Sequence, residues 1–308
     1  MINIWTPISH TANLKLTNRN LRDKFHLANF PLISGPQPGL FALLCLAMLS
    51  ITACGGKPTS TAPTTAPAAP NAEAEGERII GAYRALDNSH DSALKMSVKI
   101  QEADGQTHDV QLDIATRRES DGKRLMMINF IAPPQERDRN ALLTVFPQGD
   151  IEGTRYAQMN DSFVTAKGAT TEDSFFGMTA QEMVDGQPEK YDFRLIGEEN
   201  VNGTPAYKVE GFLKKGAESR FNRIVMLIDK ANYTAYLAEF YDNKNELQRR
   251  VTIAKNEQLG GHWTRTQYTI DNLARKKILN FEIKDAKYDQ NLSPALFTKE
   301  YLKKISVK

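Results

Sequence analysis

The segment RLMMINFI, residues 124–131, and the segment ALLTVF, residues 141–146, indicate how this chain folds. Each is short and apolar at successive positions, and the chain-breaking pair Pro133-Pro134 separates them. A strand with one exposed face alternates polar and apolar residues, whereas a strand that is apolar throughout is covered on both faces or lines an apolar cavity. We therefore expect two strands that are buried on both sides or that border a cavity.

Segments of alternating polarity extend this sheet in both directions along the chain. Residues 96–100 and 110–114 flank the turn sequence ADGQ at residues 103–106, which predicts a hairpin with one exposed face. Turn signals separate the remaining strand-like segments, which are residues 154–159, 161–165, 191–198, 205–213, 221–229, 235–242, 247–254, 262–272 and 277–286. Roughly eleven strands with few helices predict a mainly β fold with one large antiparallel sheet, curled or closed.

Two apolar segments interrupt the strand pattern. Residues 77–86 place apolar side chains at helical spacing, which predicts a short amphipathic helix on the core, with membrane-surface binding as the alternative. Residues 174–184, SFFGMTAQEMV, form an apolar loop that leads into a helical turn. This loop is either an ordinary connection over the core or a lid over an apolar cavity, where Phe and Met side chains adapt to varied acyl shapes. Ser293 and Pro294 predict a helical turn near the C-terminus.

The segment LFALLCLAMLSITACGG, residues 40–56, determines the expected compartment. Its uncharged apolar run is too short to span a bilayer, which needs roughly 20 apolar residues. It has the length of a signal-peptide core that ends at small residues. The sequence Ile-Thr-Ala-Cys at residues 51–54 resembles the lipobox of bacterial lipoproteins, in which the cysteine is acylated and the peptide is cut just before it. Cys54 is then the lipid-attachment residue, although a cleaved secretory signal with a chance cysteine is the alternative.

These features divide the chain into three predicted parts. Residues 1–53 are an N-terminal extension plus signal peptide, residues 54–76 a lipidated cysteine and disordered tether, and residues 77–308 the folded domain. The tether is rich in Pro, Ala and Thr and lacks large apolar residues, so it cannot offset its ordering entropy. Residues 1–39 are long for a signal sequence, which indicates either a misassigned start codon or a cytoplasmic extension. Gly55, where an Asp would favour retention at the inner membrane, favours the outer membrane.

Charge and cysteine content exclude several classes of function. The segment before Cys54 carries four basic residues against Asp23 alone, so the formal charge of +2 falls to nearly zero after cleavage. A near-neutral domain lacks the basic surplus that nucleic-acid binding needs. Cys45 lies in the removed segment, so the remaining domain has no thiol for a disulfide, a metal site or nucleophilic attack.

No motif in the sequence predicts an enzyme. The chain contains no HExxH zinc motif, no GxSxG nucleophile elbow and no phosphate-binding loop. The histidines of the mature chain, His90, His108 and His262, are isolated in the sequence. We therefore expect no catalytic residue, no metal and no cofactor, while a catalytic site built from scattered residues is the alternative.

Short motifs in the second half of the chain occur in the order known from one protein family. They are IDK at 228–230, EFYD at 239–242, GGHWT at 260–264, Phe281, LFT at 296–298 and Leu302, with weaker matches at 124–133, 141–143 and 174–177. Over about residues 93–303 the chain thus resembles the LolA-like outer-membrane lipoprotein-sorting proteins, in lipobox-bearing form. It departs from them at residues 177–179, where GMT replaces the usual Gly-Ser-Asp, and at residues 146–150, which are not basic.

The resemblance implies an incomplete, half-open β-barrel, in which a curved antiparallel sheet holds acyl chains on its apolar concave face under short helical lids. Such a site binds by burial of hydrocarbon, worth about 0.8 kcal/mol per CH₂ group, and needs no catalytic group. It implies a set of cavity and lid residues, which we assign to Ile80, Tyr83, Met126, Ile128, Phe130, Leu143, Phe175, Phe176, Met178, Met183 and Trp263.

We therefore expect a lipoprotein of the outer membrane of a Gram-negative bacterium, anchored through Cys54 and facing the periplasm. Its expected partners are the membrane and the acyl chains of lipids or lipoproteins, which it would help to sort or transport to the outer membrane. An envelope exporter is an additional candidate partner, and nucleic acid is not expected. The alternatives are a non-catalytic interaction module of an envelope complex, with a filled core, and an enzyme that acts on envelope lipids.

Overall fold

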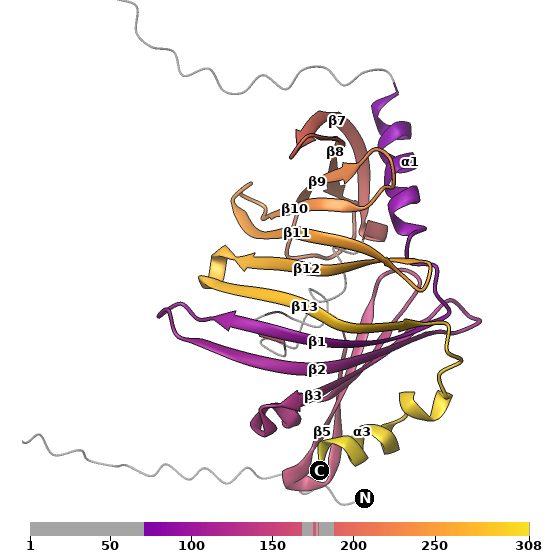
Figure 1. Cartoon of the computed structure of the whole chain (residues 1–308), viewed down its shortest axis with the longest axis vertical. Helices are drawn as coiled ribbons and strands as arrows, with labels where there is room; N and C mark the ends of the chain where they lie inside the picture. Colours follow the sequence, from indigo (N-terminus) through magenta and orange to yellow (C-terminus); the bar gives the residue numbers. More distant parts are fainter. Residues whose placement is uncertain (1–70, 168–174, 177, 179–187, 308) are drawn as a thin grey trace, which may run out of the picture. The chain divides into compact units, whose positions relative to one another are not determined.

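One antiparallel sheet contains all 13 strands of the part of the chain that the computed structural model describes, residues 71–167, 175–176, 178 and 188–307. These residues belong to the second of two units, residues 1–62 and 63–308. The strand order is β6-β5-β4-β3-β2-β1-β13-β12-β11-β10-β9-β8-β7 (Figure 1). The strands are β1 (Asp91–Gln101), β2 (Thr107–Arg118), β3 (Arg124–Ala132), β4 (Ala141–Val145), β5 (Ile151–Ala157), β6 (Ser162–Lys167), β7 (Tyr191–Val201), β8 (Thr204–Leu213), β9 (Arg223–Asp229), β10 (Ala235–Tyr241), β11 (Leu247–Leu259), β12 (His262–Asn272) and β13 (Lys277–Tyr288).

The helices are short, and along the chain they come before, between and after the strands. The α-helices are α1 (Ala72–Arg84) and α3 (Lys299–Ser306), and the 3-10 helices are η1 (Pro134–Arg139), η2 (Gln158–Asn160), η4 (Pro188–Lys190), η5 (Leu273–Arg275) and η6 (Pro294–Phe297). Among the described helices, none has the length and hydrophobicity needed to cross a membrane.

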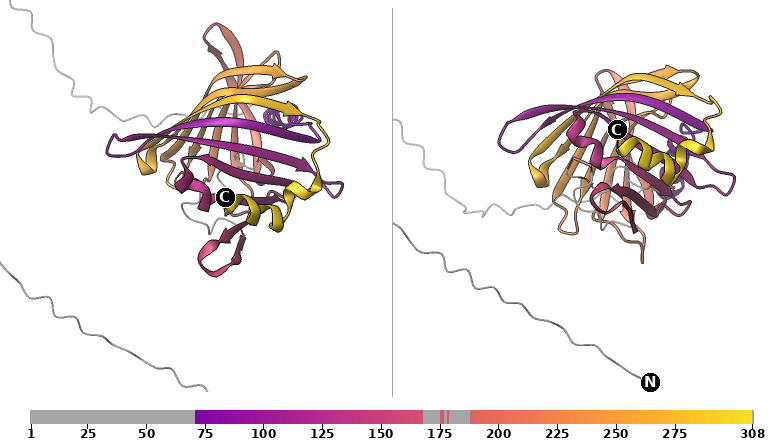
Figure 2. Two further views of the ribbon diagram at one scale, coloured as in Figure 1. Left: turned by 60° about the horizontal axis from the view of Figure 1, so that its bottom comes forward. Right: turned by 90° about the horizontal axis from the view of Figure 1, so that it is seen from below.

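The sheet is curved and, within the described residues, its edge strands β6 and β7 do not pair with each other (Figures 1 and 2). Strands β1–β6 and β7–β13 each form a meander, and pairing of β1 with β13 joins the two meanders. Bulges interrupt the register at Lys95/Met96 and between Ile253 and Asn256, and bulges bend a strand and increase its twist. This arrangement confirms the predicted mainly β, half-open antiparallel sheet, with 13 described strands where the sequence indicated roughly eleven.

A tight turn explains why β7 and β8 pair in the observed register. Asn202 and Gly203 join β7 to β8 with φ values of 52° and 90°, and Val201 pairs with Thr204 across the turn. A two-residue hairpin turn of this kind needs positive φ at both positions, which Asn and Gly adopt at low cost. The turn signal in the sequence and the observed hairpin therefore agree.

Strand β3 confirms the prediction drawn from the segment RLMMINFI. Ile128 and Phe130 face one side, where both are fully buried in an apolar cluster. Met127 faces the opposite side and packs against Leu302 and Ile305 of helix α3. Because side chains alternate along a strand, each face of β3 needs its own cover, and α3 provides one of them.

Helix α1 begins at Ala72 rather than at Glu77 and ends at Arg84, so its first residues fall in the segment predicted to be a tether. The helix runs along the edge strand β7, where the carboxylate Oε1 of Glu77 accepts a hydrogen bond from the backbone N of Phe193 at 2.7 Å. A Cβ atom on Gly76 would lie 2.4 Å from the Cα of Arg194, so the helix backbone packs directly on the strand. The helix thus covers a sheet edge that would otherwise expose unpaired backbone groups.

Candidate functional site

One face of the sheet carries a continuous apolar surface, which we call the inner face. Cross-strand pairs place Ile253 beside Tyr268, Tyr268 beside Phe281 and Phe281 beside Val98, and residues paired in this way point to the same face. Two buried clusters share this face: one lies mainly on β1–β4 and β13, the other on β7–β11 and α1. We call them the filled half and the open half, for the reasons given next.

Side chains occupy the filled half. Phe175, Phe176 and Met178 are nearly or fully buried there, with exposed fractions of 1%, 3% and 0%. The ring centroid of Phe130 lies 6.4 Å from that of Phe175 and 5.7 Å from that of Phe176, which are distances of aromatic contact. The apolar side chains on β3, among them Ile128, therefore meet protein rather than an empty space.

A tight turn holds these plugging residues in place. The backbone N of Phe175 donates to the carbonyl O of Met178 at 3.0 Å, and the N of Met178 donates to the O of Phe175 at 2.8 Å. Phe176 has a φ of 55°, a conformation that costs a bulky residue about 1–3 kcal/mol. Burial of its ring against Phe130 offsets this cost, so the turn is set by packing rather than by local preference.

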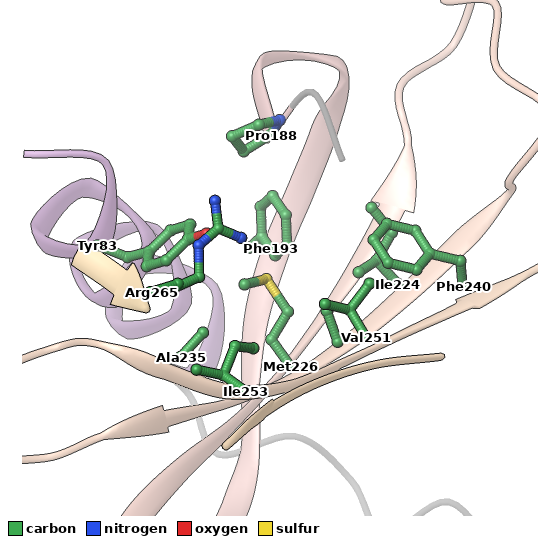
Figure 3. Close-up of a pocket in the computed structure, with 11 residues that line it drawn as sticks. Tyr83, Pro188, Phe193, Ile224, Met226, Ala235, Phe240, Val251, Ile253 and Arg265 are labelled. Carbon is green, nitrogen blue, oxygen red and sulfur yellow. The ribbon is translucent and has the colours of Figure 1, made fainter. Parts of the chain in front are cut away.

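The open half contains a pocket with an empty volume of about 450 Å³, part of which is open to solvent (Figure 3). Ligand pockets in proteins are mostly apolar. The described residues that line this pocket come from α1, η4 and strands β7 and β9–β12: Tyr83, Pro188, Phe193, Ile224, Met226, Ala235, Ala238, Phe240, Val251, Ile253 and Arg265.

Small residues make room for this pocket and for its walls. A Cβ atom on Gly211 would lie 2.5 Å from Cε1 of Phe193, so the missing side chain of Gly211 allows the Phe193 ring to adopt its position. Ala235 and Ala238 of β10 line the pocket with single methyl groups, where larger side chains would fill it. The neighbouring strands contribute larger apolar residues, and the walls are therefore apolar but not closed.

The buried hydroxyl group of Tyr191, a residue of the open half, has hydrogen-bond partners. The hydroxyl of Tyr191 donates to the carbonyl O of Phe221 at 2.7 Å and lies 2.8 Å from the Oγ of Ser219. Burial raises the pKa of Tyr191, so this phenol stays neutral at physiological pH. Tyr191 therefore serves as a rigid part of the wall.

Arg265 of β12 is the only charged residue among the described residues that line the pocket. It reaches the inner face because of a bulge: Lys255 pairs with Gln267, whereas the next residue of β11, Asn256, pairs with Arg265. The extra residue of β12 reverses the alternation of side chains beyond it. Arg265 therefore shares a face with Tyr268, and its Cζ lies 5.5 Å from the centroid of the Tyr268 ring.

The candidate residues identified from the sequence fall into four groups. Ile80 and Tyr83 belong to the open half, where Tyr83 lines the pocket. Trp263 is half-buried at the start of β12 and belongs to neither half. Cys54 and Met183 lie outside the described residues. The remaining candidates belong to the filled half: Met126, Ile128, Phe130, Leu143, Phe175, Phe176 and Met178.

Most of the pocket was therefore missed by reasoning from the sequence. The alternating residues of β9 to β11 indicated an apolar face of the sheet, but they did not indicate the pocket next to that face. Within the described part of the chain, no group of three or more His, Cys, Asp or Glu residues is placed to hold a metal ion.

Comparisons with known proteins identify the family of this chain and proteins that share its fold. A family model with the description "Uncharacterized protein" matches residues 122–304, more than half of the chain. A DUF1329 family protein from Desulfovibrio piger is 23% identical with a TM-score of 0.67, over 74% of this chain and 98% of that one. No curated protein sequence matches the chain.

Two further solved structures share the fold. A putative outer membrane lipoprotein-sorting protein domain from Vibrio parahaemolyticus is 18% identical with a TM-score of 0.65, over 75% of this chain and 99% of that one. A LolA superfamily protein from Nitrosomonas europaea is 12% identical with a TM-score of 0.56, over 73% and 98% of the two chains. The chain therefore belongs to the family that matches residues 122–304, a family with the LolA-like fold.

Proposed function

We propose that this protein is a lipoprotein, anchored through Cys54 to the outer membrane and facing the periplasm, that binds acyl chains of lipids or lipoproteins. It would take part in their sorting or transport to the outer membrane, with an envelope exporter as an additional partner. The observation that carries the proposal is the apolar pocket on the inner face of a LolA-like sheet. The names of the similar proteins from Vibrio and Nitrosomonas support the same class of cargo.

Burial of hydrocarbon supplies the binding energy in this proposal. Each methylene that leaves water for an apolar site contributes about 0.8 kcal/mol, and the walls of the pocket are apolar apart from Tyr83 and Arg265. Helix α1 forms a wall, and its attachment to β7 through Glu77 and Gly76 keeps its first half in place. Cargo therefore enters beside the C-terminal end of α1, where Tyr83 lies, rather than by removal of the whole helix.

The filled half favours a second candidate function, a non-catalytic interaction module of an envelope complex. The side chains of Phe175, Phe176 and Met178 fill that part of the inner face. In this alternative the open half is a packing defect of the core, and the protein acts through its outer surface. The two candidates differ in whether the open half takes up lipid.

The test is native mass spectrometry of the full chain purified from cells, for wild type and two variants of β10. Ala238→Phe places a ring in the pocket, whereas Leu237→Phe places the same ring at the adjacent position, whose side chain points to the opposite face. We expect co-purified lipid with wild type and Leu237→Phe and its loss with Ala238→Phe, while all three keep similar unfolding midpoints. Wild-type protein without lipid would leave the interaction module as the remaining candidate.

A further inference from the structure

We infer that Phe240 of β10 forms the end wall of the acyl site and thereby limits the length of the chain that the open half takes up. The inference rests on the proposed function and defines its ligand more narrowly, as single unbranched acyl chains up to a definite length. In this role the ring of Phe240 contacts the terminal part of the bound chain.

The pocket follows strand β10. Ala235, Ala238 and Phe240 line it in this order along the strand. A strand rises about 3.3 Å per residue, so these positions span about 16 Å. Figure 3 shows Tyr83 on one side of the pocket and Phe240 on the opposite side. The long direction of the pocket therefore runs from the C-terminal end of α1 toward Phe240.

The residues paired with Ala238 show where the pocket has room. Ala238 pairs with Met226 of β9 and with Val251 of β11, and all three line the pocket. Paired residues point to the same face of the sheet. The single methyl group of Ala238 thus leaves a groove between two larger side chains, and a groove of this kind fits an extended hydrocarbon chain.

The next set of paired residues closes this groove. Phe240 pairs with Ile224 of β9 and with Arg249 of β11, so three large side chains lie side by side where the preceding set has Ala238 at its centre. Phe240 is 6% exposed and Arg249 3% exposed. The groove along β10 therefore ends at the ring of Phe240.

A second layer of side chains holds this ring in place. The centroid of Phe240 lies 5.1 Å from that of Phe221, with 50° between the ring planes. The Cζ of Arg249 lies 5.0 Å from the ring centroid of Phe221 and 6.0 Å from that of Phe240, within the range of cation–π contact. Because protein interiors are closely packed, the ring of Phe240 cannot move aside for a longer chain without displacing these neighbours.

The alternative role of Phe240 is purely structural. Phe240 belongs to the buried cluster of the open half, and truncation of a buried Phe removes packing wherever it lies. In that case its loss would lower stability without changing the preference among chains of different length. The experiment therefore measures this preference, and thermal unfolding serves as a control for stability.

Affinities of the full chain for straight-chain fatty acids from octanoate to stearate are measured by calorimetric titration below their micelle concentrations. Each methylene that becomes buried raises affinity about fourfold, and for wild type we expect this increase to stop at a definite chain length. Phe240→Ala should move the limit to longer chains. Stearate should then gain about 15-fold in affinity, equivalent to about two further buried methylenes, while octanoate changes by less than about twofold.

Two further variants make the comparison specific. Phe240→Leu keeps part of the end wall and should shift the limit by less, and it provides the same test if Phe240→Ala does not fold. Tyr241→Ala is the matched control, because Tyr241 is the next residue of β10 and its ring contacts Arg223 outside the pocket. This control should keep the chain-length limit of wild type.

Each outcome decides the inference. A longer limit in the Phe240 variants, with none in Tyr241→Ala, supports it. A wild-type affinity that rises through stearate without a limit overturns the inference but leaves the proposed function standing. An unchanged limit in both Phe240 variants, or an equal shift in Tyr241→Ala, assigns Phe240 to packing and also overturns it. If wild type binds none of the fatty acids, the proposed function fails together with the inference.

Discussion

Two glycines of helix α1 provide a sharp test of how the helix is attached to the sheet. Gly76 and Gly81 both lie within the helix, where replacement of Gly by Ala normally stabilises a protein by about 0.5–1 kcal/mol. A Cβ atom on Gly81 would meet no atom within 4 Å, whereas one on Gly76 would lie 2.4–2.6 Å from the backbone of Arg194. The same substitution should therefore have opposite effects at the two sites.

The magnitude at Gly76 follows from the contacts that the helix makes. Backbone atoms of β7 cannot rotate away as a side chain can, so α1 must move from the strand. Extra methyl groups in a packed core typically cost about 1–3 kcal/mol, and displacement also weakens the burial of Ile79 and Ile80, both 0% exposed. After subtraction of the gain in helix propensity, we expect Gly76→Ala to lower the free energy of unfolding by about 2 kcal/mol.

Equilibrium urea unfolding of the two variants and wild type measures this difference directly. Hydrogen exchange gives a local readout, since the amide of Phe193 donates to Glu77 and should lose protection in Gly76→Ala but not in Gly81→Ala. A Gly76→Ala variant that is as stable as Gly81→Ala, with the Phe193 amide still protected, would refute the packing of α1 on β7.

Three further predictions concern other parts of the sheet. Burial alone would raise the pKa of Glu210, but hydrogen bonds from Arg223 and Arg194 outweigh it and hold the pKa below its ordinary 4.5. The stability that this carboxylate contributes at neutral pH should therefore fall as the pH drops below about 4.5. Urea unfolding measured against pH should show a weaker decline in stability for Glu210→Gln than for wild type. Phe176→Ala should lower the free energy of unfolding by about 3 kcal/mol through the cavity it leaves in the filled half, measured by urea unfolding, while palmitate affinity stays within about twofold. Asp229→Ala should lower the thermal midpoint by several degrees, because the buried carboxylate accepts hydrogen bonds from two backbone N–H groups of the β9–β10 turn, and Asp229→Asn should restore part of the loss.

Sequence patterns were sufficient to predict the strands and to predict that both faces of β3 are covered. Alternation identified the hairpin of β1 and β2, and the doubly apolar segment RLMMINFI predicted a strand with cover on both faces. Both signals are local, because the side-chain period of a strand depends only on its own residues. The start of α1 was missed for the same reason, since Gly76 is buried by contact with β7 rather than by its own hydrophobicity.

The division of the inner face into a filled and an open half could not be read from the sequence. Phe175 and Phe176 signalled an apolar segment equally suited to a lid or to a plug, and only their contacts with Phe130 show that they fill the space. The pocket lies instead where Ala235 and Ala238 of β10 leave room. Empty space results from side chains of several strands together, so no single segment encodes it.

By itself, the sequence determined the strand content, the hairpins and the apolar character of one face, because these depend on neighbours along the chain. Only the tertiary structure decided that Arg265 faces the pocket, since one extra residue in β12 reverses the side-chain alternation that the sequence would imply. A bulge depends on how two strands pair, and pairing is a property of the assembled sheet. The fold could therefore be predicted from local pattern, whereas the chemistry of its pocket required the register.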